Sequence, residues 1–106
     1  MRLLLDECVP APLKGELPGH DVSTAHDMGW SAKDNGELLA LMLANGFDCL
    51  VTVDQNLPFQ QTVSAAGVAV AVLVAPTNRL KELRPLVPAL REALEAIGPG
   101  DLVKVR

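Results

Sequence analysis

Short apolar runs alternate along this chain with polar segments that contain glycine or proline. The runs predict strands at residues 2–5, 49–53 and 68–74, and less apolar segments predict a weaker strand at 21–25 and a final strand at 102–105. They are too short for helices, and continuous apolar runs of this length are typical of strands buried on both faces. The run at 68–74 is apolar throughout and rich in β-branched residues, so we expect it in a central position, and the last run at an edge.

Segments with helix signals separate these strands, at residues 10–17, 34–43, 59–65 and 80–97. Asp34 or Asn35 can act as the N-cap of the second segment. Its apolar face is assigned to Leu38, Leu39, Leu41, Met42 and Leu43. In the last segment apolar residues recur at steps of three and four, and Pro85 and Pro88 predict a kink or two helices.

This alternation of strands and helices predicts the α/β fold class. We expect one domain over residues 1–106, a three-layer sandwich with a mainly parallel sheet of about five strands. If the strands at 2–5 and 49–53 are neighbours, the acids that follow them, Asp6 and Asp54, lie at one edge of the sheet. That edge, outside the carboxyl ends of the strands, is where open α/β sheets bind ligands.

The composition narrows the class of protein. Hydrophobic residues make up 49% of the chain, with two Phe, one Trp and no Tyr, so the core must be mainly Leu, Val and Ala. No apolar stretch approaches the ~20 residues that cross a bilayer, and no signal peptide is visible, so we expect a cytoplasmic protein without a membrane partner. Cys8 and Cys49 are isolated, and we interpret them as reduced thiols in the core.

The charge is unevenly distributed. The net charge is −4, with nine acids and three bases in residues 1–54 but four acids and six bases in residues 55–106. The whole chain therefore has no general electrostatic footprint for nucleic acid. Its later basic residues are either ordinary solvated side chains or a phosphate-binding patch. The candidate nucleic-acid contacts are Arg79, Lys81 and Arg84.

Three acids carry the main chemical hypothesis. Asp6 and Asp54 end two buried strands, and Glu37 lies in the first turn of the second helix. Clustered carboxylates repel one another unless they are protonated or share a cation. Oxygen ligands favour Mg²⁺ or Mn²⁺ over zinc, and such ions can activate water for phosphodiester hydrolysis. We therefore predict a metal site and a catalytic role for these three acids.

Several residues near these acids are secondary candidates. Asn56 can hold a metal-bound water or orient Asp54, and Thr52 can hydrogen-bond a carboxylate from its strand. Turn chemistry and strand propensity explain both equally well, so both interpretations stay open. Glu7 ranks after Asp6, because on a continuing strand it would point to the other face.

We interpret the two histidines and the single tryptophan as structural residues. His20 and His26 flank the weak second strand without ligand spacing, and we place them near the surface. Trp30 is interpreted as a lid or staple over a small core rather than as a platform for nucleic-acid bases.

Three motifs, in order, resemble the small PIN-like proteins of bacteria, which are shortened relatives of the PIN-domain ribonucleases. They are Met-Arg-Leu-Leu-Leu-Asp-Glu at 1–7, Gly-His-Asp-Val at 19–22 and Leu-Val-Thr-Val-Asp-Gln-Asn-Leu at 50–57. The resemblance covers the whole chain and implies a doubly wound α/β sandwich, Mg²⁺ or Mn²⁺ at acids on the carboxyl edge, and single-stranded RNA as substrate. Many members are toxins of toxin–antitoxin pairs, so it also implies a small antitoxin protein as a partner.

The resemblance carries over residue by residue. Asp6 and Asp54 match the family's strand-end acids, and Glu37 resembles the acid at the start of its second helix. Asn56 stands where the family often has a second aspartate, which removes one charge from the metal site. Where many relatives have consecutive acids, the matching candidates here are Asp34 and Asn35.

Two other classes of protein fit parts of the pattern. A receiver-like domain would also have acids after its first and third strands, with Asp54 as phosphoacceptor. It needs a lysine that ends the fifth strand before a last helix, whereas Lys104 lies inside the final strand. The other alternative is a non-catalytic PIN-like module that binds a partner or forms a homodimer through the apolar stripe of residues 80–97.

Overall fold

The computed structural model describes residues 1–55, 63 and 65–106. Its five strands are β1 (Arg2–Leu5), β2 (Asp21–Thr24), β3 (Cys49–Thr52), β4 (Ala69–Leu73) and β5 (Leu102–Val105). They form one sheet in the order β2-β1-β3-β4-β5, in which every neighbouring pair is parallel. The parallel sheet is therefore confirmed. The strand order, which the sequence left open, makes β1 and β3 neighbours and so meets the condition for placing Asp6 and Asp54 at one edge.

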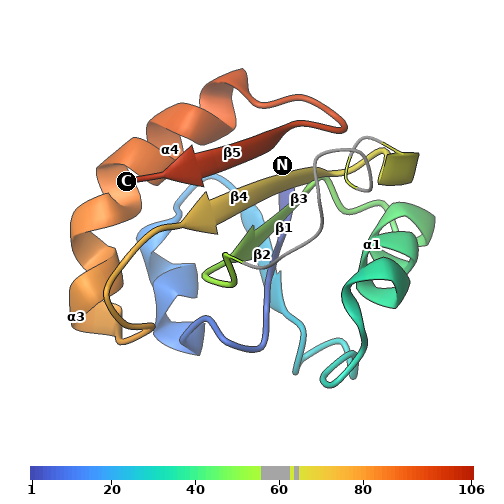
Figure 1. The fold of residues 1–106 in the computed structure, drawn as a ribbon, viewed down its shortest axis with the longest axis horizontal. Helices are drawn as coiled ribbons and strands as arrows, with labels where there is room; N and C mark the ends of the chain where they lie inside the picture. The colour runs from blue at the N-terminus through green and yellow to red at the C-terminus, as the bar shows by residue number, and fades with distance from the viewer. Residues whose placement is uncertain (56–62, 64) are drawn as a thin grey trace.

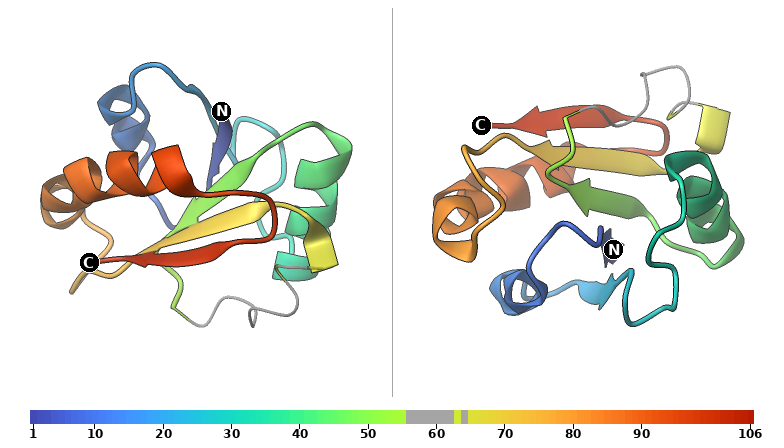
Figure 2. Two further views of the ribbon diagram at one scale, coloured as in Figure 1. Left: turned by 90° about the horizontal axis from the view of Figure 1, so that it is seen from above. Right: turned by 60° about the horizontal axis from the view of Figure 1, so that its bottom comes forward.

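The helices lie on both faces of this sheet (Figure 1). They are the 3-10 helix η1 (Ala11–Glu16), α1 (Asn35–Ala44), α3 (Leu80–Leu83), the 3-10 helix η2 (Arg84–Leu86) and α4 (Val87–Ala96). Figure 2 shows η1, α3 and α4 on one side of the sheet and α1 on the other. The described residues thus form a three-layer α/β domain, and the helix expected at residues 59–65 falls largely outside them.

Two apolar clusters hold the layers together. Successive residues of a strand point to opposite faces, so Leu3 and Leu5 pack under η1, α3 and α4, while Leu4 packs under α1. The same alternation continues in β3, where Val51 and Leu50 belong to opposite clusters. Burial on both faces is the reason that β1, β3 and β4 are mainly apolar without alternation, whereas the edge strands β2 and β5 are partly exposed and contain polar residues.

Helix α1 buries a narrower face than its sequence suggests. Leu38, Leu39 and Met42 are buried, but Leu43 is 56% exposed. The assignment of Leu43 to the core was therefore wrong. At about 100° per residue, Leu38, Met42 and Leu39 lie within one sector of about 100° that faces the sheet. Leu43 lies about 40° beyond Leu39, outside this sector, and therefore points to solvent.

The last helical segment is divided, as its prolines predict. Residues 84–86 form the 3-10 turn η2 between α3 and α4. Pro85 has no N–H to donate, so an uninterrupted α-helix is disfavoured there. Leu83, Leu90 and Leu94 of the apolar stripe are buried against the chain's own sheet. Leu80, Val87 and Ile97 of the stripe pack against the same cluster but remain partly exposed, so a homodimer through this stripe stays a prediction.

Trp30 packs as a staple, as expected. Its ring meets Phe47 edge to face, with ring centroids 5.6 Å apart, and it covers the cluster beneath α1.

Among the described residues, none of the helices has the length and apolar character that crossing a bilayer requires.

The two cysteines are free thiols in different surroundings. Cys8 is half-buried and Cys49 is buried. Burial raises the pKa of the Cys49 thiol to about 12, so at pH 8 this thiol is protonated and unreactive.

We therefore expect a thiol reagent at pH 8 to label Cys8 first, and Cys49 only when the chain unfolds. Mass spectrometry of the native and the urea-denatured protein measures this. In a Cys8→Ser variant the native protein should take up no label, and rapid native labelling of that variant would contradict the buried position of Cys49.

Candidate active site

The connections of the sheet diverge at one point of its carboxyl edge, between β1 and β3. From β1 the chain passes through η1 to β2 on one side, and it returns through α1 to β3 on the other side of β1. In doubly wound sheets of this order, ligands bind where the connections diverge, outside the carboxyl ends of the first and third strands. Asp6 follows β1 directly, and Asp54 comes two residues after the end of β3.

A cleft of about 420 Å³ opens at this point. The residues that line it are Asp6, Glu7, Cys8, Lys33, Asp34, Asn35, Val53 and Asp54. It therefore combines four carboxylates with one ammonium group. Its volume lies in the usual range of small-ligand sites, and we call it the acidic cleft.

Thr52 joins the two strand-end acids beneath the acidic cleft. Its Oγ1 donates to Oδ2 of Asp6 at 2.8 Å and accepts from the backbone N–H of Asp54 at 3.1 Å. The side chain of Thr52 is fully buried, where a hydrogen bond is electrostatically stronger than in water. Oδ1 of Asp6 also accepts from the backbone N–H of Glu7 at 2.9 Å. The carboxylate of Asp6 is therefore held at both oxygens.

Asp34 reaches the acidic cleft because it caps α1. Its Oδ1 accepts from the backbone N–H of Glu37 at 2.8 Å. This hydrogen bond holds the pKa of Asp34 below its usual value, so the carboxylate is ionised at neutral pH. Asn35 is the first residue of the helix and also lines the cleft. The structure thus assigns the cap to Asp34, the choice that the sequence left open.

Of the three acids predicted to form the site, Glu37 does not line the acidic cleft with Asp6 and Asp54. Its side chain is exposed, and it is not among the residues that line the acidic cleft. The next residue, Leu38, faces the sheet, so Glu37 leaves the helix in another direction. Its role at a metal stays a prediction, and Asn56 lies outside the described residues.

Glu7 has a role that the sequence did not suggest. Its Oε2 accepts from the backbone N–H of Ala32 at 3.1 Å. Ala32 has a φ of 65°, in the left-handed region that a residue with a Cβ rarely adopts. This contact holds the loop that carries Lys33 and Asp34 against the end of β1. It was missed because residues 7 and 32 are far apart in sequence and no local motif joins them.

The three basic candidates are not equivalent. Arg84 is paired with Glu16, with Nε 2.7 Å from Oε1. Arg79 and Lys81 are exposed at the start of α3. Just before them, the side-chain amide of Asn78 donates to the carbonyl of Cys8 at 2.9 Å. Because Cys8 lines the acidic cleft, this bond ties the turn that leads into α3 to the rim of that cleft.

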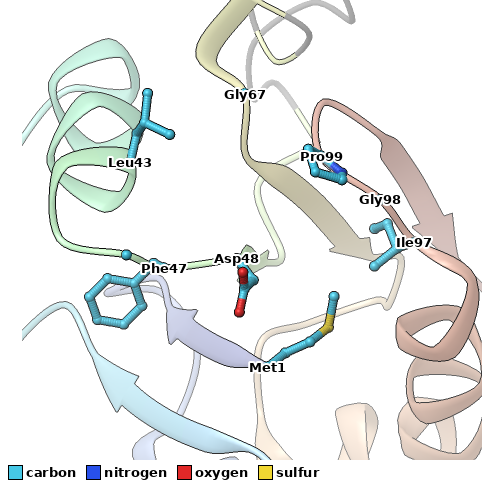
Figure 3. Close-up of a pocket in the computed structure, with 9 residues that line it drawn as sticks. Met1, Leu43, Phe47, Asp48, Gly67, Ile97, Gly98 and Pro99 are labelled. Atoms are coloured by element: carbon cyan, nitrogen blue, oxygen red, sulfur yellow. The ribbon is translucent and has the colours of Figure 1, made fainter.

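A second pocket lies at the opposite edge of the sheet (Figure 3). It measures about 260 Å³, and Leu43 and Met1, two exposed large hydrophobic residues, line it. Among the described residues that line this pocket, Asp48 is the one with a carboxylate. Oδ2 of Asp48 already accepts from the backbone N–H of Arg2. This pocket has no set of groups for catalysis, so the acidic cleft is the candidate active site.

The hydroxyl of Thr52 is expected to matter for any activity of the acidic cleft. Thr52→Val should lower activity about 10- to 100-fold if the carboxylate that it orients binds a metal, because loss of such a partner typically has an effect of this size. Thr52→Ser keeps the hydroxyl and should retain activity near that of the unchanged protein. Initial rates under conditions where all variants are folded measure this. Thr77→Val is the matched control, because Thr77 also accepts a backbone N–H but lies outside the cleft. Equal rates for the serine and valine variants of Thr52 would contradict the role.

No family model, curated protein or solved structure matched the chain when it was compared with them. The hydrolytic chemistry proposed for the chain therefore rests on the residues and geometry of the acidic cleft. Single-stranded RNA as the substrate rests on the resemblance of the three sequence motifs to PIN-like proteins.

Proposed function

We propose that the chain is a metal-dependent ribonuclease that hydrolyses phosphodiesters of single-stranded RNA at the acidic cleft. One observation carries the proposal: Asp6 and Asp54 follow neighbouring parallel strands, and the buried hydroxyl of Thr52 bonds to the carboxylate of Asp6 and to the backbone N–H of Asp54. Burying a hydroxyl costs free energy unless its hydrogen bonds are made. Two acids that only terminated strands would not need such a buried hydroxyl between them.

The residues of the acidic cleft fit Mg²⁺ or Mn²⁺. Within residues 1–55, 63 and 65–106, no three His, Cys, Asp or Glu side chains are grouped closely enough to hold an ion together. Mg²⁺ does not need such a cage, because it keeps several waters and binds through one or two carboxylates together with substrate phosphates. Asp6 and Asp54 would hold the ion, which would polarise the phosphate and lower the pKa of a bound water.

The chain's own residues then have separate tasks. Thr52 and the backbone of Glu7 orient the carboxylate of Asp6. Lys33 is the one cation among the lining residues and would contact a substrate phosphate. The four carboxylates otherwise repel phosphate, so the cleft would admit RNA only together with a cation.

The direct test is the metal dependence of RNA cleavage. Purified protein is freed of metal with a chelator and incubated with a labelled single-stranded RNA, alone or with Mg²⁺ or Mn²⁺. We expect cleavage only when one of the ions is added. Cleavage at the same rate without any divalent ion would remove the proposed mechanism.

We also propose, from the resemblance to PIN-like toxins alone, that the ribonuclease is the toxin of a pair and that a small antitoxin protein binds it. Expression of the chain should then arrest bacterial growth, and Asp54→Asn should relieve the arrest. A small DNA-binding protein encoded next to the chain would be the candidate partner.

A receiver-like phosphoacceptor is the second candidate, because the observed strand order and the acids after β1 and β3 suit such a domain as well. Lys104, the nearest counterpart of the lysine that it needs, is exposed on β5 and does not line the acidic cleft. Beryllofluoride with Mg²⁺ mimics a phosphorylated aspartate. A beryllofluoride complex that Asp54→Asn removes would favour the receiver over the nuclease.

A further inference from the structure

A second cleft adjoins the acidic cleft across the end of β1. It measures about 460 Å³ and lies where β1 and β2 end. The residues that line it are Asp6, Glu7, Val9, Pro10, Ala11, Thr24, His26 and Ser31. Asp6 and Glu7 line both clefts, so the two adjoin at these residues on the sheet edge. We call the second one the neutral cleft.

The two clefts differ in chemistry. Apart from the shared Asp6 and Glu7, the residues that line the neutral cleft include no Asp, Glu, Lys or Arg. Val9, Pro10 and Ala11 make one part apolar, while Thr24 and Ser31 contribute hydroxyls and His26 an imidazole. An apolar wall beside a few polar groups is the usual lining of a small-molecule site, and the volume is in the usual range.

We propose that the neutral cleft binds the nucleoside next to the scissile phosphate, so that an RNA strand crosses from one cleft to the other over Asp6. The inference rests on the proposed ribonuclease function and adds a substrate subsite to it. Proteins bind single-stranded RNA by stacking unpaired bases on aromatic or histidine side chains and by hydrogen bonds to the ribose hydroxyl. His26 and the apolar wall suit a base, and the hydroxyl of Ser31 suits the sugar. Oγ1 of Thr24 already accepts from the backbone N–H of Asp27 at 2.9 Å, so Thr24 serves as part of the wall.

A nucleoside fits the neutral cleft better than a phosphate does. A phosphate placed there would face Asp6 and Glu7, with His26 as the sole basic group among the lining residues. In the acidic cleft the phosphate has Lys33 and the proposed metal ion as partners. The charges therefore place the scissile phosphate on one side of Asp6 and an uncharged part of the nucleotide on the other.

The test compares two substrates on variants of the neutral cleft. Methyl p-nitrophenyl phosphate is a small diester that needs only the acidic cleft, whereas a single-stranded RNA needs both. His26→Ala removes the stacking group, and Ala11→Trp fills the cleft from an exposed position. His20→Ala is the matched control, because His20 lies beside the amino group of Met1 at the other edge of the sheet.

We expect His26→Ala to lower kcat/KM for RNA about 5- to 150-fold, the range that loss of one base-stacking side chain produces. Most of the change should appear in KM, and Ala11→Trp should act in the same direction. Both variants should hydrolyse the small diester as fast as the unchanged protein, and His20→Ala should leave both substrates unaffected. Circular dichroism and an unchanged Tm confirm that each variant is folded.

Two results would overturn the subsite. One is an unchanged rate of RNA cleavage in both His26→Ala and Ala11→Trp. That result would remove the subsite but leave the ribonuclease proposal intact. The other is equal loss of RNA and small-diester hydrolysis in folded variants, because the changes would then act on the acidic cleft. If the unchanged protein hydrolyses neither substrate with Mg²⁺ or Mn²⁺, the ribonuclease proposal itself fails and the subsite fails with it.

Discussion

Asp54→Asn is expected to reduce metal-dependent RNA cleavage by at least about 100-fold, since even an outer partner of a metal ligand typically contributes 10- to 100-fold. The substitution keeps the size of the side chain and the backbone N–H that bonds to Thr52, so the fold should be unchanged. It removes a negative charge from the point where we place the cation. Initial cleavage rates at saturating Mg²⁺, together with thermal unfolding curves, measure the effect.

Two further variants make the test specific. Asp6→Asn should have an effect of similar size, because Asp6 is the other carboxylate that would hold the ion. Asp48→Asn is the matched control, since Asp48 lies at the opposite edge of the sheet and asparagine can still accept from the backbone N–H of Arg2. Activity that survives in either of the first two variants would remove the acidic cleft as the active site.

Leu50→Ala is expected to cause the largest loss of stability, a reduction of about 2–5 kcal/mol in the free energy of unfolding. Leu50 lies in β3, the middle strand of the sheet, and is fully buried in the cluster beneath α1. Truncation removes buried apolar surface and leaves a cavity that the neighbouring strands can only partly fill. Because domains of this size have a total stability of about 5–15 kcal/mol, the effect should be large in a urea titration.

Leu43→Ala is the control for this measurement. It is the same substitution at a leucine that is 56% exposed, so the free energy of unfolding should change by no more than about 0.5 kcal/mol. Equal losses for the two leucines would mean that the core is not arranged as described.

Much of the fold could be predicted because its signals are local. Leu3 to Leu5 and Cys49 to Val51 are apolar without a break because both faces of these strands are covered. Pro85 interrupts the last helix by its own covalent structure. Asp6 and Asp54 were recognised as candidates because they follow the strands predicted at residues 2–5 and 49–53, which needs no knowledge of the neighbouring strand.

The candidate site was predictable only in part, because contacts between distant segments complete it. The pairing of β1 with β3 and the bond from Thr52 to Asp6 join residues more than forty positions apart. The bond from Ala32 to Glu7 likewise depends on the path of a loop, and it keeps Asp34 at the cleft. Local propensity carries no information on such pairs.

By itself, the sequence determined the strands, the parallel α/β class and the two acids at strand ends, since hydrophobic periodicity and strand length are properties of single segments. The tertiary structure alone decided which acid of the second helix reaches the cleft and which leucine remains exposed. Both depend on the rotation of α1 against the sheet: the same rotation that buries Met42 turns Leu43 to solvent, and the cap places Asp34 rather than Glu37 at the acidic cleft. That rotation is set by packing across the whole sheet, so no segment of the chain encodes it separately.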